Sequence, residues 1–437
     1  MTSHLQAQRW LSRLVAVRPD EVRALLWSFA YFFCLLCSYY ILRPIREEMG
    51  VAGGVNNLPW LFTGTFVAML VAIPLYSAVV ARYPRRRIIP IVYRFFSLNL
   101  LAFFVLLRLD VAPIHVGRVF FIWISVFNLF VVSIFWSFMA DIFKSEQGKR
   151  LFGFIAAGGS AGALLGPLLT AKLVKPFGAT NLFLVSIVLL EAAVLCVGQL
   201  DRWAPAIARA ASPVSLAGDQ APRPPSPDTE GRVGGSVFGG IKLVVQSGYL
   251  LGICLQTLFL TTTATFLYLQ QARIVSASSV DPAERTAMFA AIDFTANALT
   301  IVVQALLTGR IITRLGLAFS LGLLPVLTGI GFLGLAVAPL VSVLAVFQGG
   351  RRAIHYAVER PAREILFTVV GPEAKYKSKS FIDTVVYRGG DAASGWAFAG
   401  LTAGLGLGAT AMALITVPMA GVWLLVTRYL ARKQETL

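Results

Sequence analysis

The chain is a succession of apolar runs, separated by short loops that hold most of its charged residues, Pro and Gly. A helix crosses the hydrocarbon core of a bilayer in about 20 residues, and the runs have that length. They predict twelve spans, at 22–44, 59–80, 88–108, 116–140, 151–174, 179–200, 249–271, 286–308, 317–338, 342–368, 379–404 and 408–429. The pattern therefore predicts an all-α membrane protein with twelve transmembrane helices.

Two stretches interrupt this succession. In 5–17, apolar side chains at helical spacing lie opposite Arg9 and Arg13, which predicts an amphipathic helix on the cytoplasmic surface. Within 201–248, a Pro-rich run with few large apolar side chains predicts a cytoplasmic linker. We expect an N-terminal segment, a six-helix bundle, the linker, a second six-helix bundle and a cytoplasmic tail, at 1–21, 22–200, 201–248, 249–429 and 430–437.

The two halves of the chain repeat each other weakly. Arg82-Tyr-Pro follows the second span and Arg314-Leu-Gly follows the eighth, while a glycine-rich stretch in the fifth span, 158–162, corresponds to 389–391 in the eleventh at nearly the same offset. Two pseudo-symmetric six-helix halves of this kind resemble the major facilitator superfamily. The offset also predicts that 342–368, although rich in charge, is a helix facing water or protein.

Composition narrows the class of protein. The chain is 57% hydrophobic and 14% charged, whereas soluble domains have about 45–50% apolar and about 25% charged residues. This excludes a soluble enzyme, a disulfide-rich secreted module and a disordered chain. Most of the 38 Lys and Arg lie in loops on one side of the predicted spans. The positive-inside rule then predicts a multi-pass protein of the bacterial cytoplasmic (inner) membrane, with both termini in the cytoplasm.

Charges within spans are the candidates for function, because each costs several kcal/mol at the bilayer centre unless paired or hydrated. The tenth span carries ionisable side chains at four-residue spacing, namely Arg351, His355, Glu359 and Arg363. Two pairs are spaced to neutralise each other, Glu359–Arg363 and Arg360–Glu364. Arg351 and Arg352 have no acidic residue at helical spacing, so they would attract a phosphate or carboxylate. The alternative is structural pairing across helices, with Asp293 or Glu191.

The ends of two other spans carry further charges. In the first, Arg43 and Glu47 are four residues apart and can pair. Pro44 is expected to break or kink that helix; an interfacial helix end is the alternative interpretation. The eleventh span opens with three lysines, which either steer an anion or serve topology, followed by further charges: Lys375, Lys377, Lys379, Asp383 and Arg388.

Other motifs point to packing and gating rather than to catalysis. Gly158, Gly162 and Gly166 recur every four residues, which predicts a face where another helix packs closely. Arg82 and Arg314 are candidate gating residues, with topology alone as the alternative. The sequence has three histidines and lacks HExxH and GxSxG, and its Cys-x-x-Cys has no second ligand pair. We expect no enzymatic activity, no cofactor and no metal.

Three motifs carry a family resemblance. Ser38-Tyr-Tyr-Ile-Leu-Arg-Pro-Ile-Arg-Glu-Glu resembles the first-span motif of the ATP/ADP translocase family of plastids and intracellular bacteria. Arg360-Pro-Ala-Arg-Glu-Ile-Leu-Phe and Lys375-Tyr-Lys-Ser-Lys-Ser-Phe-Ile-Asp are similar to its span 10–11 signature. The resemblance implies a twelve-span facilitator-like fold and nucleotide exchange or uptake. It implies functional roles for Arg46, Arg363, Glu364, Lys377, Lys379 and Asp383.

Two departures from the family's pattern indicate a divergent bacterial member. Arg46 stands where the family usually has lysine, and the fourth span has no acidic residue at the expected distance before Trp136.

We therefore predict a transporter that works by alternating access, with an organic anion, a nucleotide or another phosphate ester, as substrate. The expected substrate-binding residues are Arg43, Arg46, Arg351, Arg352, Arg363, Lys377 and Lys379. The residues expected to pair with these charges or to couple ions are Glu47, Asp293, His355, Glu359, Arg360, Glu364, Asp383 and Arg388. We expect a monomer whose partners are this small molecule and the lipid bilayer, and no nucleic acid.

Two alternatives stay open at this point. The first is a proton-coupled facilitator for an unrelated solute, with Glu364, Asp293 or His355 as the proton site. The second is a membrane sensor that transports nothing.

Overall fold

The computed structural model describes residues 18, 21–82, 85–143, 145–210, 239–306, 308–371, 378–379 and 381–436. The amphipathic helix expected at 5–17, the Pro-rich part of the linker and Lys377 lie outside these residues. Within the described residues, every regular element is a helix. The all-α fold class predicted from the hydropathy pattern is thereby confirmed.

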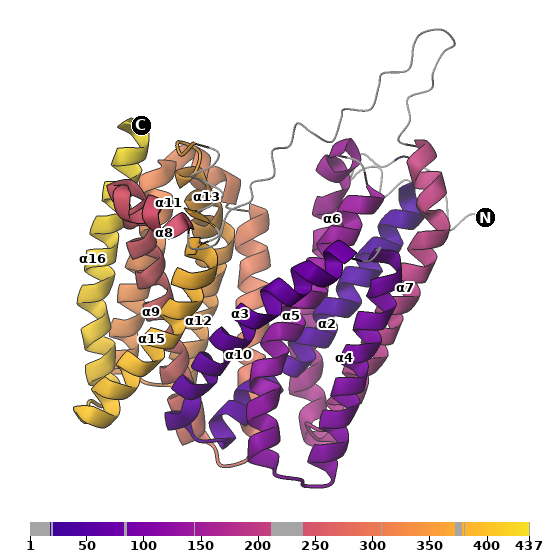
Figure 1. Ribbon diagram of the computed structural model, residues 1–437. Helices are drawn as coiled ribbons and strands as arrows, with labels where there is room; N and C mark the ends of the chain where they lie inside the picture. Colours follow the sequence, from indigo (N-terminus) through magenta and orange to yellow (C-terminus); the bar gives the residue numbers. More distant parts are fainter. Residues whose placement is uncertain are drawn as a thin grey trace. The chain divides into compact units, whose positions relative to one another are not determined.

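The chain folds into two compact units (Figure 1), Met1–Met49 with Val67–Pro224 and Gly50–Phe66 with Pro225–Leu437. We call them unit 1 and unit 2. The described helices of the first half are α2 (Val22–Ala52), η2 (Val55–Asn57), α3 (Leu58–Arg82), α4 (Arg85–Arg108), α5 (Pro113–Ile142), α6 (Ser145–Phe177) and α7 (Leu182–Ala210). Those of the second half are α8 (Gly239–Gln246), α9 (Gly248–Ser278), α10 (Pro282–Leu306), α11 (Thr308–Val337), α12 (Val341–Ile354), α13 (Arg360–Leu366), α15 (Tyr387–Ala399) and α16 (Ala409–Thr436).

Ten stretches of helix in the described part of the chain are long and apolar enough to cross a membrane. The two other predicted spans are also helical, but charged and irregular. α12 passes into α13 through the π-helical turn η3 (His355–Glu359), and α15 lies between two more such turns, η4 (Ile382–Val386) and η5 (Gly400–Gly404). π turns are rare in proteins, and those that occur are frequently found at functional sites. Their presence here therefore points to 342–368 and 379–404 as candidates for a functional site.

The first span differs from its prediction at its C-terminal end. It was predicted to end at residue 44, with a break or kink at Pro44, whereas α2 continues to Ala52 with Pro44 inside it, so the helix does not break there. The kink stays a prediction. Proline removes one backbone donor from a helix. Here the neighbouring side chains of Leu42 and Ile45 are almost completely buried, and this packing maintains the helix on both sides of the proline.

Residues 50–66 belong to unit 2 because α3 begins on α15. The Trp60 and Trp396 rings are 4.7 Å apart between centroids and nearly perpendicular. The Trp396 Nε1–H donates a hydrogen bond to Thr63 Oγ1 at 3.0 Å. Edge-to-face aromatic contact together with a satisfied indole donor is a stable arrangement.

In unit 1, α6 approaches α2 closely along its glycines. A Cβ atom added at Gly158 would lie 2.4 Å from the Phe29 carbonyl oxygen, and one at Gly162 would lie 2.4 Å from that of Phe33. At Gly166 the corresponding distance, to the Cys37 carbonyl oxygen, is 2.9 Å. The side of α6 with these glycines is therefore the side on which the backbone of α2 lies.

A buried carboxylate joins the first turns of α2 and α6. Glu21 is fully buried and accepts hydrogen bonds from the Arg18 backbone N–H at 3.0 Å, from Gln147 at 2.9 Å and from Arg150 at 3.0 Å. Burial by itself raises the pKa of the Glu21 carboxyl, but these hydrogen bonds outweigh it and lower the pKa below the usual 4.5. The ionised form of Glu21 therefore stabilises the folded chain.

We expect Glu21→Gln to lower the free energy of unfolding by about 1–3 kcal/mol at pH 7, because charged hydrogen bonds are lost in a buried site. Since the folded-state pKa is lowered, this stabilisation is present above the unfolded-state pKa and lost as the pH falls through the folded-state value. Thermal melts of the two proteins should thus differ at pH 7 and converge in acid. The control is Glu191→Gln, at an exposed pair with Arg94, which should change the melting temperature little. A difference between the wild type and Glu21→Gln that stays constant at all pH values would contradict the role of ionised Glu21 in stability.

Candidate functional site

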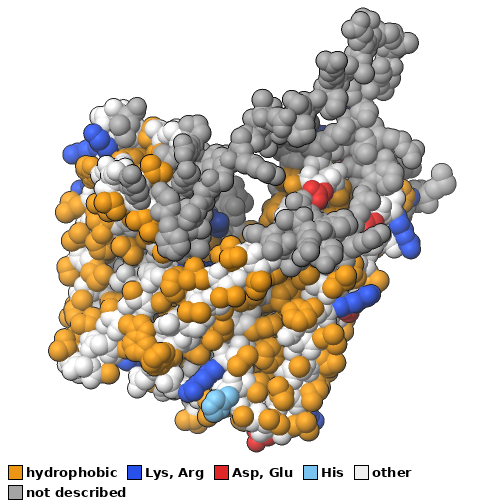
Figure 2. Space-filling view, viewed as in Figure 1, with side chains coloured by type: hydrophobic (Ala, Val, Ile, Leu, Met, Phe, Trp, Pro, Cys, Tyr) orange, Lys and Arg blue, Asp and Glu red, His pale blue; other side chains and the backbone are white. Residues whose placement is uncertain are grey.

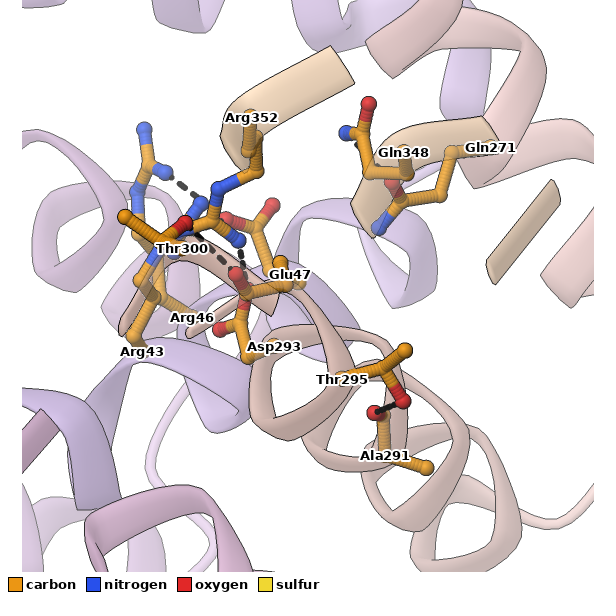
Figure 3. A network of polar contacts seen from close by, with 11 residues as sticks. Arg43, Arg46, Glu47, Gln271, Ala291, Asp293, Thr295, Thr300, Gln348 and Arg352 are labelled. Atoms are coloured by element: carbon orange, nitrogen blue, oxygen red, sulfur yellow. Dashed lines mark hydrogen bonds and ion pairs between the residues drawn. The ribbon is translucent and has the colours of Figure 1, made fainter. Parts of the chain in front are cut away.

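In unit 1, the charged residues near the end of α2 form a compact group. Arg46 Nη1 lies 3.0 Å from Glu47 Oε1, and Arg43 Nε lies 3.9 Å from the same oxygen. Arg46 also donates to the Phe121 carbonyl oxygen at 3.3 Å and lies 3.7 Å from the centre of the Phe121 ring. Glu47 is buried. Arg46, expected to bind substrate, is therefore already paired (Figure 3).

In unit 2, Arg352 was expected to be unpaired, and this expectation is wrong. Its Nη1 lies 2.6 Å from Asp293 Oδ1 on α10 (Figure 3). The structural pairing considered as the alternative therefore applies to this arginine, because two helices distant in sequence are neighbours. One turn earlier on α12, Gln348 donates to Gln271 of α9 at 2.9 Å. α12 thus presents polar side chains to two neighbouring helices.

Arg351, the next residue to Arg352, has a different environment. It is buried and donates to the Leu260 carbonyl oxygen at 3.1 Å and to Thr263 Oγ1 at 3.0 Å, both on α9. Among the described residues no carboxylate lies within ion-pair distance of it, and its Nε has no hydrogen-bond partner. Arg351 is thus a buried cation held, within the described part of the chain, by neutral acceptors.

Glu359 was expected to pair with Arg363, and it does not. The Glu359 carboxylate is completely buried. It is hydrogen-bonded to His355 Nδ1 at 2.9 Å and accepts a hydrogen bond from Gln256 Nε2 of α9 at 3.3 Å. The partner of Glu359 is therefore the residue four positions earlier, within the π turn η3, and not the residue four positions later. Arg363 instead has a carboxylate partner on another element, Asp383.

Arg363 is also buried, with its Nη2 at 3.4 Å from Asp383 Oδ1 of η4. Its Nε and Nη1 atoms are buried without a hydrogen-bond partner in the described part of the chain. Glu364, expected to pair with Arg360, instead accepts from Lys379 at 2.5 Å. Arg363 and Glu364 of the predicted span 10 therefore pair with Asp383 and Lys379 of span 11 rather than with residues of their own helix.

In the described part of the chain, no ion pair joins the remaining predicted residues to those above. Arg360 and Arg314 are exposed, and neither forms an ion pair with a described residue. Arg388 lies 3.8 Å from Asp391. The side chain of Arg82 is outside the described part of the structure.

Sequence reasoning missed the polar side chains of α9. This helix supplies the acceptors for Arg351 and the donor for Glu359, and its buried polar side chains are Gln256, Thr257, Thr261, Thr263, Thr265, Gln270 and Gln271. Their recurrence within an otherwise apolar span is a signal that was available in the sequence. Uncharged polar residues buried in a membrane helix hydrogen-bond to neighbouring helices.

The chemistry of the site suits an anion. Arg351 and Arg363 both have guanidinium N–H groups without partners among the described residues, and a carboxylate or phosphate oxygen is the acceptor that best fits such groups. Of the neighbouring acids, Glu359 contacts His355, and within the described residues Asp383 contacts only the Nη2 atom of Arg363.

The membrane-length helices of the described residues, with a group of charges buried among them, identify a multi-pass integral membrane protein. Residues 22–352 match the Major Facilitator Superfamily, so the chain belongs to this family and is a membrane transporter.

Solved structures agree on the fold. The chain resembles the nucleoside transporter NupG with a TM-score of 0.63 and 11% identity, covering 95% of this chain and 99% of that one. It resembles the POT family transporter PepTSo with a TM-score of 0.62 and 15% identity, covering 95% and 98%. It resembles a bacterial homolog of the human lysosomal transporter Spinster with a TM-score of 0.58 and 13% identity, covering 96% and 94%. No curated protein matches the chain in sequence.

Proposed function

We propose that this protein transports an organic anion by alternating access and that Arg351 and Arg363 bind the anion. The observation that carries the proposal is three buried guanidinium nitrogens without partners among the described residues, Arg351 Nε and Arg363 Nε and Nη1. A buried donor without a partner costs about 1–3 kcal/mol, and more where it is charged. A substrate anion that accepts from these nitrogens would remove this cost, which favours its binding.

The substrate we propose is a nucleotide or another phosphate ester. Support comes from the motifs at 38–48, 360–367 and 375–383, which resemble those of the ATP/ADP translocase family. The two arginines suit this chemistry, because a guanidinium group forms two parallel hydrogen bonds with a phosphate. Lys379, which pairs with Glu364 beside the same cluster, would attract the anion.

The test uses the purified full chain in proteoliposomes loaded with ADP. Uptake of labelled ATP that saturates and increases with internal ADP would support nucleotide exchange. A thermal-shift screen against nucleotides, sugar phosphates and carboxylates tests the anion site and the nucleotide substrate separately. Stabilisation by other organic anions alone would contradict the nucleotide substrate, and stabilisation by none would contradict the anion site.

We also propose the cellular arrangement that the sequence predicts. The two six-helix bundles are 22–200 and 249–429, joined by a cytoplasmic linker in a monomer of the bacterial inner membrane, with both termini in the cytoplasm. The support is the excess of Lys and Arg on one side of the spans.

A second candidate function is proton-coupled transport, and one observation favours a site for it. Each of the groups expected to carry the proton has a short contact with a charged or ionisable partner. Asp293 lies 2.6 Å from Arg352, Glu364 lies 2.5 Å from Lys379, and His355 lies 2.9 Å from Glu359. Asp391 on α15 is held more loosely, with Thr265 Oγ1 at 3.4 Å and Arg388 Nη1 at 3.8 Å. A loosely held carboxylate exchanges its proton with less loss of other interactions.

We expect Asp391→Asn to abolish the stimulation of uptake by an imposed pH gradient while exchange without a gradient continues. The amide keeps the shape of the side chain but cannot take up a proton. The measurement compares initial uptake rates with and without the gradient. Glu364→Gln is the matched control and should retain stimulation; the opposite result for the two variants would assign the proton to Glu364.

A further inference from the structure

We propose that unit 2 binds one anionic phospholipid of the surrounding bilayer in a groove between α11 and α16. The site is separate from the charged cluster of α12, α13 and α15, and the inference does not depend on the transported substrate.

The first part of the site is apolar. A groove of about 480 Å³ runs between the two helices, with the small residues Ala318 and Gly322 in its lining and larger side chains, including Phe319 and Val326, beside them. A Cβ atom at Gly322 would lie 3.1 Å from Leu424 Cδ1, so the helices are close together there. Phe319 and Val326 are 47% and 44% exposed. The groove therefore opens on the outer, apolar side of the unit, where lipid chains lie.

The second part of the site is cationic. A concavity of about 470 Å³ at the last turns of α16 is lined by Arg428, Arg432 and Lys433, together with Tyr429. Arg428 lines the groove as well, so the two spaces share this side chain. Figure 2 shows basic side chains at this end of the unit, next to the apolar surface. None of the three basic residues forms an ion pair within the part of the chain that the structure describes.

The backbone marks where the two parts meet. α11 departs from helical geometry at Gly316, where φ is +77° and ψ is 175°, a conformation open essentially only to glycine. Leu315, the preceding residue, lines the groove together with Arg428. The end of the groove thus coincides with the break in α11 and with the first basic residue of the cationic concavity.

This combination fits an amphipathic anion better than a soluble one. Basic side chains at the end of a transmembrane helix attract an anionic phospholipid headgroup, and the groove beside α16 would take an acyl chain. Inorganic phosphate would use only the cationic part. If the three basic residues served topology alone, the protein would bind anionic and zwitterionic lipids equally.

The experiment is native mass spectrometry of the full chain in detergent, with equal amounts of phosphatidylglycerol and phosphatidylcholine. We expect the wild type to retain phosphatidylglycerol preferentially. Arg428→Gln/Arg432→Gln/Lys433→Gln should reduce that preference by about 100-fold, because three favourable contacts with an anionic headgroup are lost. The matched control, Arg108→Gln/Lys172→Gln/Lys175→Gln, removes the same charge at other exposed positions and should keep the preference.

A second variant tests the apolar part. Ala318→Leu adds volume in the groove at an exposed position and leaves every charge in place, so it should weaken phosphatidylglycerol retention without unfolding the protein. Inorganic phosphate at millimolar concentration should not displace the lipid. Absence of any preference in the wild type, equal loss in the control, or displacement by phosphate alone would overturn the proposal.

Discussion

Replacing Gly162 by leucine should destroy the packing of α2 against α6 and prevent unit 1 from folding stably. Even the first added carbon would lie 2.4 Å from the Phe33 carbonyl oxygen and 2.8 Å from the Cys37 backbone nitrogen. Backbone atoms cannot move aside as a flexible side chain can, so the two helices would have to separate along their length. Overpacking in a core usually costs about 1–3 kcal/mol, and here the contact is with backbone. We expect little or no monodisperse protein by fluorescence-detected size-exclusion chromatography.

The control for this prediction lies on the same helix. A Cβ atom added at Gly153 of α6 would meet nothing within 4 Å in the described part of the chain, so Gly153→Ala should be neutral or stabilise by up to about 1 kcal/mol through helix propensity. Gly162→Ala should have a yield of folded protein and a melting temperature between those of Gly162→Leu and the wild type. Normal yield and melting temperature for Gly162→Leu would mean that α2 and α6 are not in the contact described.

Arg363→Gln and Arg351→Gln should each reduce substrate affinity by about 100-fold or more. A hydrogen bond to a charged group contributes about 1.5–3 kcal/mol, and a guanidinium group can donate two to one anion. Glutamine keeps a polar side chain but removes the charge and the paired geometry. Arg363→Lys should recover only part of the affinity, because lysine retains the charge without the planar fork. The measurement is the KM and maximal rate of uptake in proteoliposomes.

Arg360→Gln serves as the matched control for this prediction. It removes the same charge from the same helix, at an exposed position outside the buried cluster, and should change KM less than about twofold. Melting temperatures of all variants, measured without substrate, distinguish loss of binding from loss of folding. An unchanged KM in both Arg351→Gln and Arg363→Gln, in well-folded protein, would contradict the anion site.

The agreement between sequence and structure depends on how local each feature is. The helix at 113–142 lies close to the predicted span 116–140, because the length of an apolar run reports directly on membrane crossing. The end of α2 was misplaced, because the rule for Pro44 describes an isolated helix and not one packed on both sides. The pairs Glu359–Arg363 and Arg360–Glu364 were wrong for a different reason, since partners from another helix compete with partners on the same one: Arg363 pairs with Asp383 and Glu364 pairs with Lys379.

Composition and spacing along the chain were sufficient for the membrane class, the helical content and the residues whose charge requires an explanation. Which of those charges are neutralised depends instead on the packing of the helices. Asp293 is 59 residues from Arg352, and Thr263 is 88 residues from Arg351. Contacts at such separations are set by which helices are neighbours and by how each is rotated. Of the adjacent arginines 351 and 352, one therefore pairs with a carboxylate, and the other keeps a buried donor without a partner among the described residues.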